Sequence, residues 1–365
     1  MSRVAVLGVG LIGGSIGLAA RQRLGAEVVG YDADPSTLER ALERGALDAA
    51  CDSVADAVEG AAAVFCAVPV GVLPGLVAEA LAASDEGAVV TDVGSTKRGL
   101  IAALPSGGDV ERFIGGHPLA GAETSGIEHA RPELFEGARW YLVPTERSSG
   151  VQYDRLQRTI AELGARPLAI DAVSHDRMMA TVSHLPHVIA NVLVSEAAGA
   201  LGDDSDRLPE VGPSFRDTTR VAGANPSIWV DIFASNRGAL AEEIDGVVER
   251  LGRAAELLRA DDVEGLAEWH REALADRRRL AEAELVGGPL SELRVSVTNK
   301  PGTVAEIALA LGRAGVNIED MALYPAPDMR TGAVSLWVAG EGEARRAAEV
   351  VSELGYTVSP VSGGE

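Results

Sequence analysis

The sequence predicts an α/β protein built on a doubly wound parallel sheet of Rossmann type, followed by an all-helical domain and a small βαββαβ domain of ferredoxin-like order. Three observations lead to this prediction. Strand patterns alternate with helical patterns over residues 1–171, only helical patterns follow over 172–285, and strands return over 286–365. We therefore expect three domains with these boundaries, and the stretch LVGGPLS is typical of a linker into the last one.

The first element is a short apolar strand at residues 3–7, and a glycine-rich turn follows it. Gly8, Gly10 and Gly13 form a G-x-G-x-x-G pattern between strand and helix, which lets backbone approach a pyrophosphate at a helix N-terminus. Asp32 ends the next strand, about 20 residues on, where an acid meets the ribose hydroxyls and repels a 2′-phosphate. This Rossmann-type pattern predicts NAD in preference to NADP. The alternative, a turn that binds no ligand, requires strand, glycines, helix and acid to coincide by chance. The expected cofactor contacts are Gly8, Gly10, Leu11, Ile12, Gly13, Asp32, Val68, Pro69 and Ser95.

The rest of the first domain continues the same alternation. Strands are expected at 26–32, 61–69, 87–95, 112–118 and 139–145, helices at 34–46, 71–84 and 96–105, and a last helix and strand within 148–170. In doubly wound sheets, ligands lie outside the carboxyl ends of the strands. The segments DVGS and GGHP both follow strands, so His117 is expected to face the cofactor crevice.

Two histidines in the helical domain are candidate substrate contacts. His184 and His187 lie on either side of Pro186, and a proline inside a helix bends the chain. The spacing also suits a metal, but no carboxylate or cysteine joins them at a convincing distance in sequence, so we expect no metal. The remaining alternative is that both are ordinary polar residues of a helix.

An arginine cluster lies further along the helical domain. Arg216, Asp217 and Arg220 precede Trp229. A guanidinium suits bidentate recognition of a carboxylate, and Asp217 would hold one arginine in place. Surface ion pairing in an acidic protein is an equally good explanation of the spacing alone.

The composition excludes several classes of function. A net charge of −22 argues against nucleic-acid binding, which needs clustered lysine and arginine. Two cysteines are too few for a disulfide scaffold. No apolar run approaches about 18 to 20 residues, so we expect no membrane-spanning helix. The chain passes from MSR directly into a strand, without a signal-peptide pattern. These features predict a cytoplasmic protein with neither a membrane nor a nucleic-acid partner.

Six motifs, in this order, resemble those of the prephenate dehydrogenases: GVGLIGGS, DVGSTK, GGHPLAGAETSG, VSHLPH, FRDTTRVA and NPSIWVDI. The tail, VTNKPGTVAEIALALGRAGVNIEDM, resembles an ACT domain, a small module that senses amino acids. The resemblance implies oxidative decarboxylation of prephenate to 4-hydroxyphenylpyruvate with NAD taking the hydride, and a homodimer formed through the helical domain. Arogenate dehydrogenase shares the scaffold and stays an alternative. A non-catalytic regulator that responds to NAD and amino acids is a more distant one.

The resemblance also implies roles for individual residues. It makes His117 the catalytic residue and places Ser95 beside it and the nicotinamide. An imidazole with an ordinary pKa near about 6.5 is suited to accept the substrate's hydroxyl proton at neutral pH. The resemblance implies that His187 and Arg220 bind the substrate, Arg220 as carboxylate anchor. Further candidate contacts are His184, Asp217 and Glu123, and Trp229 either lines the substrate pocket or belongs to the core.

Two features of the sequence qualify these roles. Ala122 stands where many relatives carry a hydroxyl residue, so a hydrogen bond to the substrate is either missing or supplied by Glu123. Because the protein is anionic and so is the substrate, we also expect Lys97 and the arginines to make the site locally positive.

In the tail, two segments are expected to bind an effector. In the loop TNKPGTV, Pro301 fixes φ, Gly302 lets backbone approach a ligand, and the helix that starts near Thr303 offers free N–H groups to a carboxylate. Tyrosine, the end product of the implied pathway, is the expected effector, and a domain that only dimerises is the alternative. The second segment, VNIED at 316–320, would supply carbonyls or the Asn317 amide to the ammonium group of an amino acid. The expected contacts are Asn299, Pro301, Gly302, Asn317 and Ile318.

Overall fold

The structure is a computed structural model, and it describes residues 3–121, 124–201, 212–284, 290–298, 303–316, 318, 320–326 and 331–361. The chain divides into two compact units, Met1–Glu249 and Arg250–Glu365, and each is described by itself.

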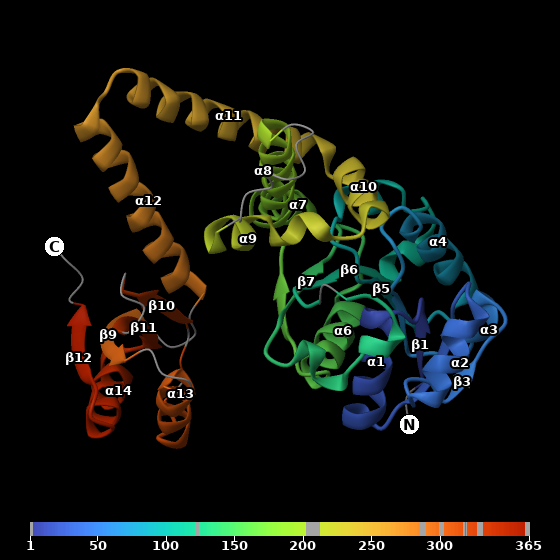
Figure 1. Cartoon of the computed structure of the whole chain (residues 1–365). Helices are drawn as coiled ribbons and strands as arrows, with labels where there is room; N and C mark the ends of the chain where they lie inside the picture. Colours follow the sequence, from blue (N-terminus) through green and yellow to red (C-terminus); the bar gives the residue numbers. More distant parts are fainter. Residues whose placement is uncertain are drawn as a thin grey trace. The chain divides into compact units, whose positions relative to one another are not determined.

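The first unit is built on an eight-stranded sheet of order β3-β2-β1-β4-β5-β6-β7-β8 (Figure 1). The strands are β1 (Arg3–Leu7), β2 (Glu27–Tyr31), β3 (Ala49–Ala50), β4 (Ala63–Cys66), β5 (Val89–Asp92), β6 (Phe113–Pro118), β7 (Arg139–Val143) and β8 (Arg166–Ala169). The strand order reverses at β1, which lies between β2 and β4, and such a reversal opens a crevice at the carboxyl ends of the strands.

The expectation of a wholly parallel sheet is wrong at one pair of strands. β7 runs antiparallel to β6, and β8 runs parallel to β7. A parallel neighbour needs a crossover connection, usually a helix. The described residues between β6 and β7 form only the short 3₁₀ turns η3 (Ile127–His129) and η4 (Pro132–Phe135), which supply no such crossover.

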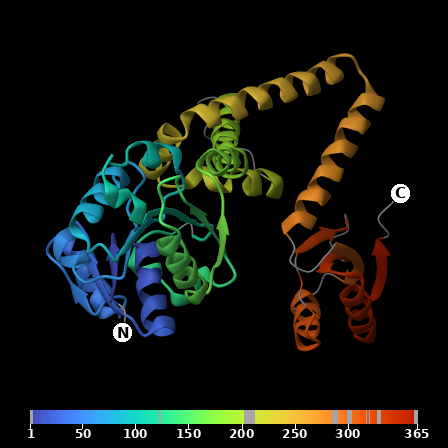
Figure 2. The same ribbon diagram turned by 180° about the vertical axis from the view of Figure 1, so that it is seen from behind.

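Helices cover both faces of this sheet (Figure 2). Side chains alternate along a strand, so Val4 and Val6 of β1 enter one core and Ala5 and Leu7 enter the other. The first core is completed by α1 and α6 around the fully buried Trp140, and the second by α3 and α4. The helical segments are α1 (Leu11–Ala19), η1 (Ala20–Leu24), α2 (Pro35–Glu43), α3 (Val54–Val58), α4 (Leu73–Ala83), α5 (Arg98–Ala102), η2 (Gly108–Arg112) and α6 (Gly150–Glu162).

After the sheet the first unit is helical, as the sequence predicts. A π-helical turn, η5 (Ala180–His184), joins α7 (Ala172–Met179) to α8 (Leu185–Leu201). The elements that follow are α9 (Pro213–Thr219), the 3₁₀ turn η7 (Arg220–Gly223), α10 (Pro226–Ser235) and α11 (Arg237–Arg259).

One of these helices corrects an expectation about membranes. Among the described residues, Ala172–Gly199 is the helix that is long and apolar enough to cross a membrane by length and composition. The core helix of a globular protein passes the same test. Here His175, Asp176 and His184 are all fully buried and hydrogen-bonded to other protein groups, which is the behaviour of a helix packed on protein.

The second unit contains α12 (Val263–Glu284) and a four-stranded antiparallel sheet of order β10-β11-β9-β12. Its remaining elements are β9 (Leu290–Thr298), α13 (Thr303–Arg313), β10 (Asp320–Pro325), β11 (Thr331–Ala339), α14 (Glu341–Glu353) and β12 (Thr357–Val361). α13 and α14 lie on the same side of this sheet (Figure 1). Val295, Leu336 and Val351 are fully buried between the helices and the strands.

Candidate active site

The glycine turn after β1 has the close packing that its pattern predicts. Gly8 has a φ of +91°, and a Cβ there would lie 2.5 Å from the Ala67 carbonyl oxygen. A Cβ on Gly13 would collide with the carbonyl oxygen of Gly8, so only glycine lets helix α1 pack against the turn. A Cβ on Gly10 would meet nothing within 4 Å, which leaves the helix N-terminus open to a ligand. Leu11 and Ile12 form the first turn of α1, whose N–H groups are the ones a pyrophosphate would use.

Asp32 lies directly after β2 and ties this turn to the strand end. Its Oδ2 accepts the Val9 N–H at 2.7 Å, and its Oδ1 accepts the Asp34 N–H at 3.0 Å. Each carboxylate oxygen has a second lone pair. The carboxylate is therefore fixed at the crevice and able to accept hydrogen bonds from ribose hydroxyls, so the turn, helix and acid fit an NAD molecule.

Other expected cofactor contacts follow β4 and β5. Val68 is partly buried against the core and, with Pro69, follows the carboxyl end of β4. Ser95 follows the end of β5, and its hydroxyl oxygen is buried without a hydrogen-bond partner among the described residues. A buried hydroxyl without a hydrogen-bond partner costs free energy in a folded protein, so Ser95 is a suitable group to hydrogen-bond a bound ligand.

His117 lies on β6 and is 9% exposed, and two glycines before it let the strand pass over a crowded layer. A Cβ on Gly116 would collide with the Asp92 carbonyl oxygen and lie 2.8 Å from the Thr91 hydroxyl. A Cβ on Gly115 would lie 3.1 Å from the Lys97 side chain. The glycine pair is therefore a packing requirement that brings the strand of His117 close to β5.

The group beneath the glycines is a fully buried ion pair between Lys97 and Asp92. The other oxygen of Asp92 accepts the Gly116 N–H at 3.0 Å. The expectation that Lys97 supplies positive charge to an anionic substrate is therefore wrong. Its ammonium group is already neutralised by Asp92 and has no exposed surface.

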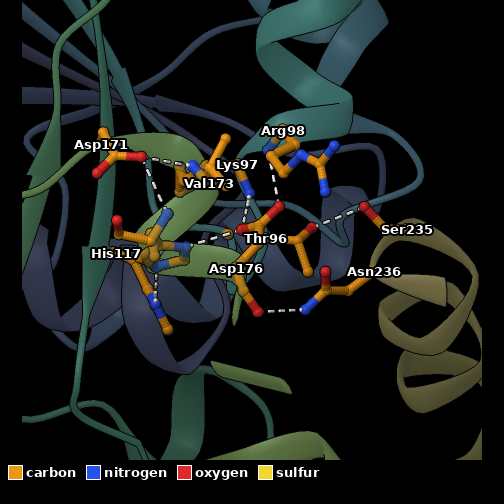
Figure 3. Close-up of polar contacts among 12 residues, drawn as sticks. Thr96, Lys97, Arg98, His117, Asp171, Val173, Asp176, Ser235 and Asn236 are labelled. Atoms are coloured by element: carbon orange, nitrogen blue, oxygen red, sulfur yellow. Dashed lines mark hydrogen bonds and ion pairs between the residues drawn. The ribbon is translucent and has the colours of Figure 1, made fainter. Parts of the chain in front are cut away.

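A chain of hydrogen bonds leads from His117 into the protein. His117 Nδ1 lies 2.9 Å from His175 Nε2, and His175 Nδ1 lies 2.8 Å from Asp176 Oδ1. Asp176 also accepts the backbone N–H groups of Lys97 at 2.7 Å and Arg98 at 2.9 Å, where α5 begins. Figure 3 shows His117, Lys97, Arg98 and Asp176 gathered in one polar cluster.

The environment fixes the charge of two members of this chain. Burial is the main reason that the pKa of His117 lies well below 6.5, and His175, Lys97 and His184 lower it further. Burial disfavours the charge of Asp176, but hydrogen bonds from His175, Arg98 and Lys97 outweigh burial, so its pKa lies below 3.8. At neutral pH, His117 is therefore a neutral imidazole and Asp176 a carboxylate.

Asn236, which follows α10, joins this cluster to His184. Its side-chain nitrogen donates to the Asp176 backbone carbonyl at 2.7 Å (Figure 3). The same nitrogen lies 3.2 Å from His184 Nδ1. Burial lowers the pKa of His184 to about 4. Because a neutral His184 accepts at Nδ1, its proton is on Nε2. That Nε2 is buried without a partner in the described part of the chain, so it is a donor available to a ligand.

His187 stacks on Trp229 of α10, with ring centroids 3.6 Å apart and planes 16° apart. Burial lowers the pKa of His187 below its ordinary value. His184 meets the same indole edge-on at a centroid distance of 6.2 Å. The two histidines and the tryptophan expected to contact substrate therefore form one aromatic cluster.

The arginine cluster lies on α9 and the turn that follows it. Arg216, Asp217 and Arg220 are all exposed. The turn of Arg220 packs against α8, the helix that carries His187. The structure thus brings Arg220 to the helix of the aromatic cluster.

Several expected residues lie outside the described residues. They are Glu123 with its neighbour Ala122, and the effector positions Asn299, Pro301, Gly302 and Asn317. Ile318 is described, and its side chain packs against the core of the second unit.

Sequence reasoning missed His175, Asp176, Asn236 and the partner of Lys97. One signal was available for the first two. His175 and Asp176 are adjacent and follow the last strand of the sheet closely, so they start a helix near the strand ends. Nothing in the spacing of Asn236 indicated its contact with Asp176, because the two lie sixty residues apart in sequence.

The sheet topology, the glycine turn with Asp32, and a neutral histidine beside the strand ends define an NAD-dependent oxidoreductase. Two family models match the chain, the nucleotide-binding domain of prephenate dehydrogenase at residues 16–168 and its dimerization domain at residues 171–272. The chain belongs to the prephenate dehydrogenase family.

Individual relatives agree with this assignment. A prephenate dehydrogenase of Bacillus subtilis (strain 168) is 28% identical over 360 residues, covering 95% of each chain. One of Lactococcus lactis subsp. cremoris (strain MG1363) is 31% identical over 320 residues, covering 85% of this chain and 86% of the relative.

Two solved structures are also similar. One is prephenate dehydrogenase from A. aeolicus in complex with hydroxyphenyl propionate and NAD+, with a TM-score of 0.72 and 30% identity over 77% of this chain and 98% of that one. The other is Synechocystis arogenate dehydrogenase, with a TM-score of 0.66 and 28% identity over 76% of this chain and 99% of that one.

Proposed function

We propose that this enzyme oxidises and decarboxylates prephenate to 4-hydroxyphenylpyruvate. The observation that carries the proposal is the state of His117, which is a neutral, buried imidazole. His117 lies on β6, and Ser95 follows the neighbouring strand β5. NAD, when bound, supplies the hydride acceptor. The relatives named prephenate dehydrogenase support the choice of substrate.

The chemistry requires one proton acceptor beside the reacting carbon. Prephenate is a cyclohexadienol with a ring carboxylate and a pyruvyl carboxylate. As hydride leaves C4, the hydroxyl proton passes to His117, the bond to the ring carboxylate breaks to release CO₂, and its electrons complete the aromatic ring. The phenolate oxygen of the product then regains a proton from the His117 imidazolium. A neutral imidazole accepts that proton, whereas an imidazolium would not. Ser95 is the buried hydroxyl that would orient the substrate oxygen.

The substrate carboxylates have three proposed partners. The N–H of His184 is a buried donor without a partner among the described groups. His187 stacks on Trp229, and His184 meets the same indole edge-on. Arg220, with Asp217 on the preceding helix, would anchor a carboxylate bidentately.

The closest rival is arogenate, which carries an amino group where prephenate has a keto group. The Synechocystis neighbour is named for that substrate. Purified enzyme should be assayed by NADH absorbance with each substrate in turn. Turnover with prephenate that exceeds turnover with arogenate supports the proposal, and the reverse ranking contradicts it. No turnover with either would favour a non-catalytic regulator.

We further propose that residues 286–365 form an ACT-type module that responds to tyrosine, and that the enzyme is a cytoplasmic homodimer. The βαββαβ order of elements and the antiparallel sheet support the module. The dimerization-domain match at residues 171–272 supports the dimer. We keep the three domains at 1–171, 172–285 and 286–365 as part of this proposal.

A further inference from the structure

We propose that His175 and Asp176 are positioning residues that fix the tautomer of His117, so that its Nε2 is free to accept the substrate proton. This inference rests on the proposed function, because it explains how His117 is ready to act as an acceptor. Neither residue belongs to the motifs that led to the family.

The carboxylate of Asp176 determines where the proton of His175 lies. Asp176 is fully buried and ionised, so it can only accept hydrogen bonds. Its oxygens accept the N–H groups of Lys97 and Arg98 at 2.7 and 2.9 Å, which anchor it at the start of α5. The His175 Nδ1 that lies 2.8 Å from Asp176 Oδ1 must therefore carry a proton.

The proton on His175 Nδ1 determines in turn the direction of the hydrogen bond between His175 and His117. His175 is fully buried, and a second buried charge is costly where a neutral form exists. A neutral His175 with a proton on Nδ1 has a bare Nε2. That bare nitrogen lies 2.9 Å from His117 Nδ1, so His117 Nδ1 must donate.

The proton on His117 Nδ1 leaves the other ring nitrogen, Nε2, available to the substrate. A neutral His117 that donates from Nδ1 has its lone pair on Nε2, and the lone pair is what a hydroxyl proton needs. When that proton arrives, the imidazolium keeps its Nδ1–H bond to His175, and the carboxylate beyond stabilises the positive charge. The same logic governs the aspartate of a Ser-His-Asp triad, which holds the tautomer without taking the proton.

The direct test is nuclear magnetic resonance of the full chain with ¹⁵N-labelled histidine. Long-range correlations distinguish an Nδ1–H ring from an Nε2–H ring, and the His117→Asn spectrum identifies the signal by its loss. We expect the Nδ1–H form for His117 in the wild type. An Nε2–H form would overturn the inference, whatever the substrate is found to be.

The kinetic test uses His175→Phe, which removes both hydrogen bonds, and His175→Gln, which keeps an acceptor toward His117. We expect His175→Phe to lower kcat about 10²-fold, with KM for prephenate and NAD changed by less than about threefold, and His175→Gln to recover part of the loss. Tyr141→Phe is the matched control, because its ring packs edge-on to His175 at 5.9 Å and its hydroxyl meets only Met178 among the described groups.

The outcomes separate the two proposals. A wild type that turns over prephenate while His175→Phe keeps its kcat overturns the positioning role alone. Equal losses in His175→Phe and Tyr141→Phe would assign the effect to packing and also overturn it. A wild type inactive on prephenate overturns the proposed function, and the tautomer measurement still decides the role of His175.

Discussion

At the scale of single residues, the glycine pair before His117 is set by what lies underneath. The strand crosses a fully buried ion pair, Lys97 with Asp92, and a side chain on Gly116 would collide with the Asp92 backbone. The motif GGHP identified His117 through resemblance to a family. It contained no information on the ion pair, because that partner lies on a different strand and only the fold brings it near.

The first prediction concerns this packing. Gly116→Ala should lower the free energy of unfolding by about 1 to 3 kcal/mol, the usual cost of overpacking a core. Gly75→Ala on α4 is the control, since its new Cβ would meet nothing within 4 Å and the change favours a helix. Urea unfolding measures both variants. A Gly116→Ala enzyme as stable as Gly75→Ala would contradict the prediction, because it would show that a Cβ at position 116 fits without a collision.

The second prediction concerns the acid at the crevice. Asp32 should make activity with NAD exceed activity with NADP, because its carboxylate repels a 2′-phosphate. Asp32→Asn keeps a hydrogen-bond acceptor for the Val9 N–H but removes the charge, so it should narrow the ratio of kcat/KM between the two cofactors. Equal activity of the wild type with both cofactors would refute this role.

At the scale of elements, the turn that carries His184 is the feature sequence patterns predicted least well. The proline in VSHLPH indicated a bent helix, and the structure has a π-helical turn, Ala180–His184, immediately before α8. Such turns widen the helix by one residue and recur at functional sites. The apolar pattern of a π turn differs too little from that of an α-helix for periodicity to reveal it. Its effect is to bury His184 while His187, one turn on, stacks on Trp229.

The third prediction follows from the burial of His184. Its pKa is about 4 in the folded protein against 6.5 ordinarily, so the unfolded chain takes up a proton first as the pH falls. The stability that the neutral ring contributes is fully present above pH 6.5 and is lost progressively toward pH 4. The free energy of unfolding, measured by urea titration across this window, should therefore fall less in His184→Gln than in the wild type. The exposed His129→Gln should behave as the wild type, and matching slopes in all three proteins would contradict the prediction.

At the scale of the whole molecule, the order of elements was predictable and their assembly was not. Strand and helix patterns gave the alternation of the first domain and the βαββαβ order of the tail. They did not predict that β7 runs antiparallel to β6, because the direction of β7 depends on the connection before it, whose described residues form no crossover helix. The hydrogen bonds that lead from His117 to Asp176 could not be predicted either, because they form only when the sheet and the helical part are folded together.

The fourth prediction concerns the proposed ACT-type module at residues 286–365. A chain that stops after residue 287 should remain active and lose inhibition by tyrosine, because the proposed cofactor and substrate contacts all precede this point and the proposed effector contacts all follow it. Inhibition of the full chain should correspond to a coupling of roughly 1 to 3 kcal/mol between the sites. Steady-state rates with and without tyrosine measure it. A full-length enzyme that neither responds to tyrosine nor binds it in calorimetry would contradict the sensor.

The fifth prediction concerns the homodimer. Leu251 and Leu258 lie two turns apart on α11 and are 61% and 65% exposed, as expected for a face that meets a partner. Light scattering at micromolar concentration should report a dimer, and Leu251→Glu with Leu258→Glu should weaken it. Val151→Glu on α6, 71% exposed in the wild type, is the control and should leave the dimer intact. A monomeric wild type would refute the assembly.

The most direct test of the account is a single-turnover measurement of NADH formation from prephenate, with wild-type enzyme and His117→Asn. We predict that the variant binds prephenate and NAD with affinities close to those of the wild type, and that the rate of hydride transfer falls about 10²- to 10⁴-fold because the proton acceptor is gone. A variant that forms NADH at nearly the wild-type rate would contradict the account, because the hydroxyl proton would then have another destination.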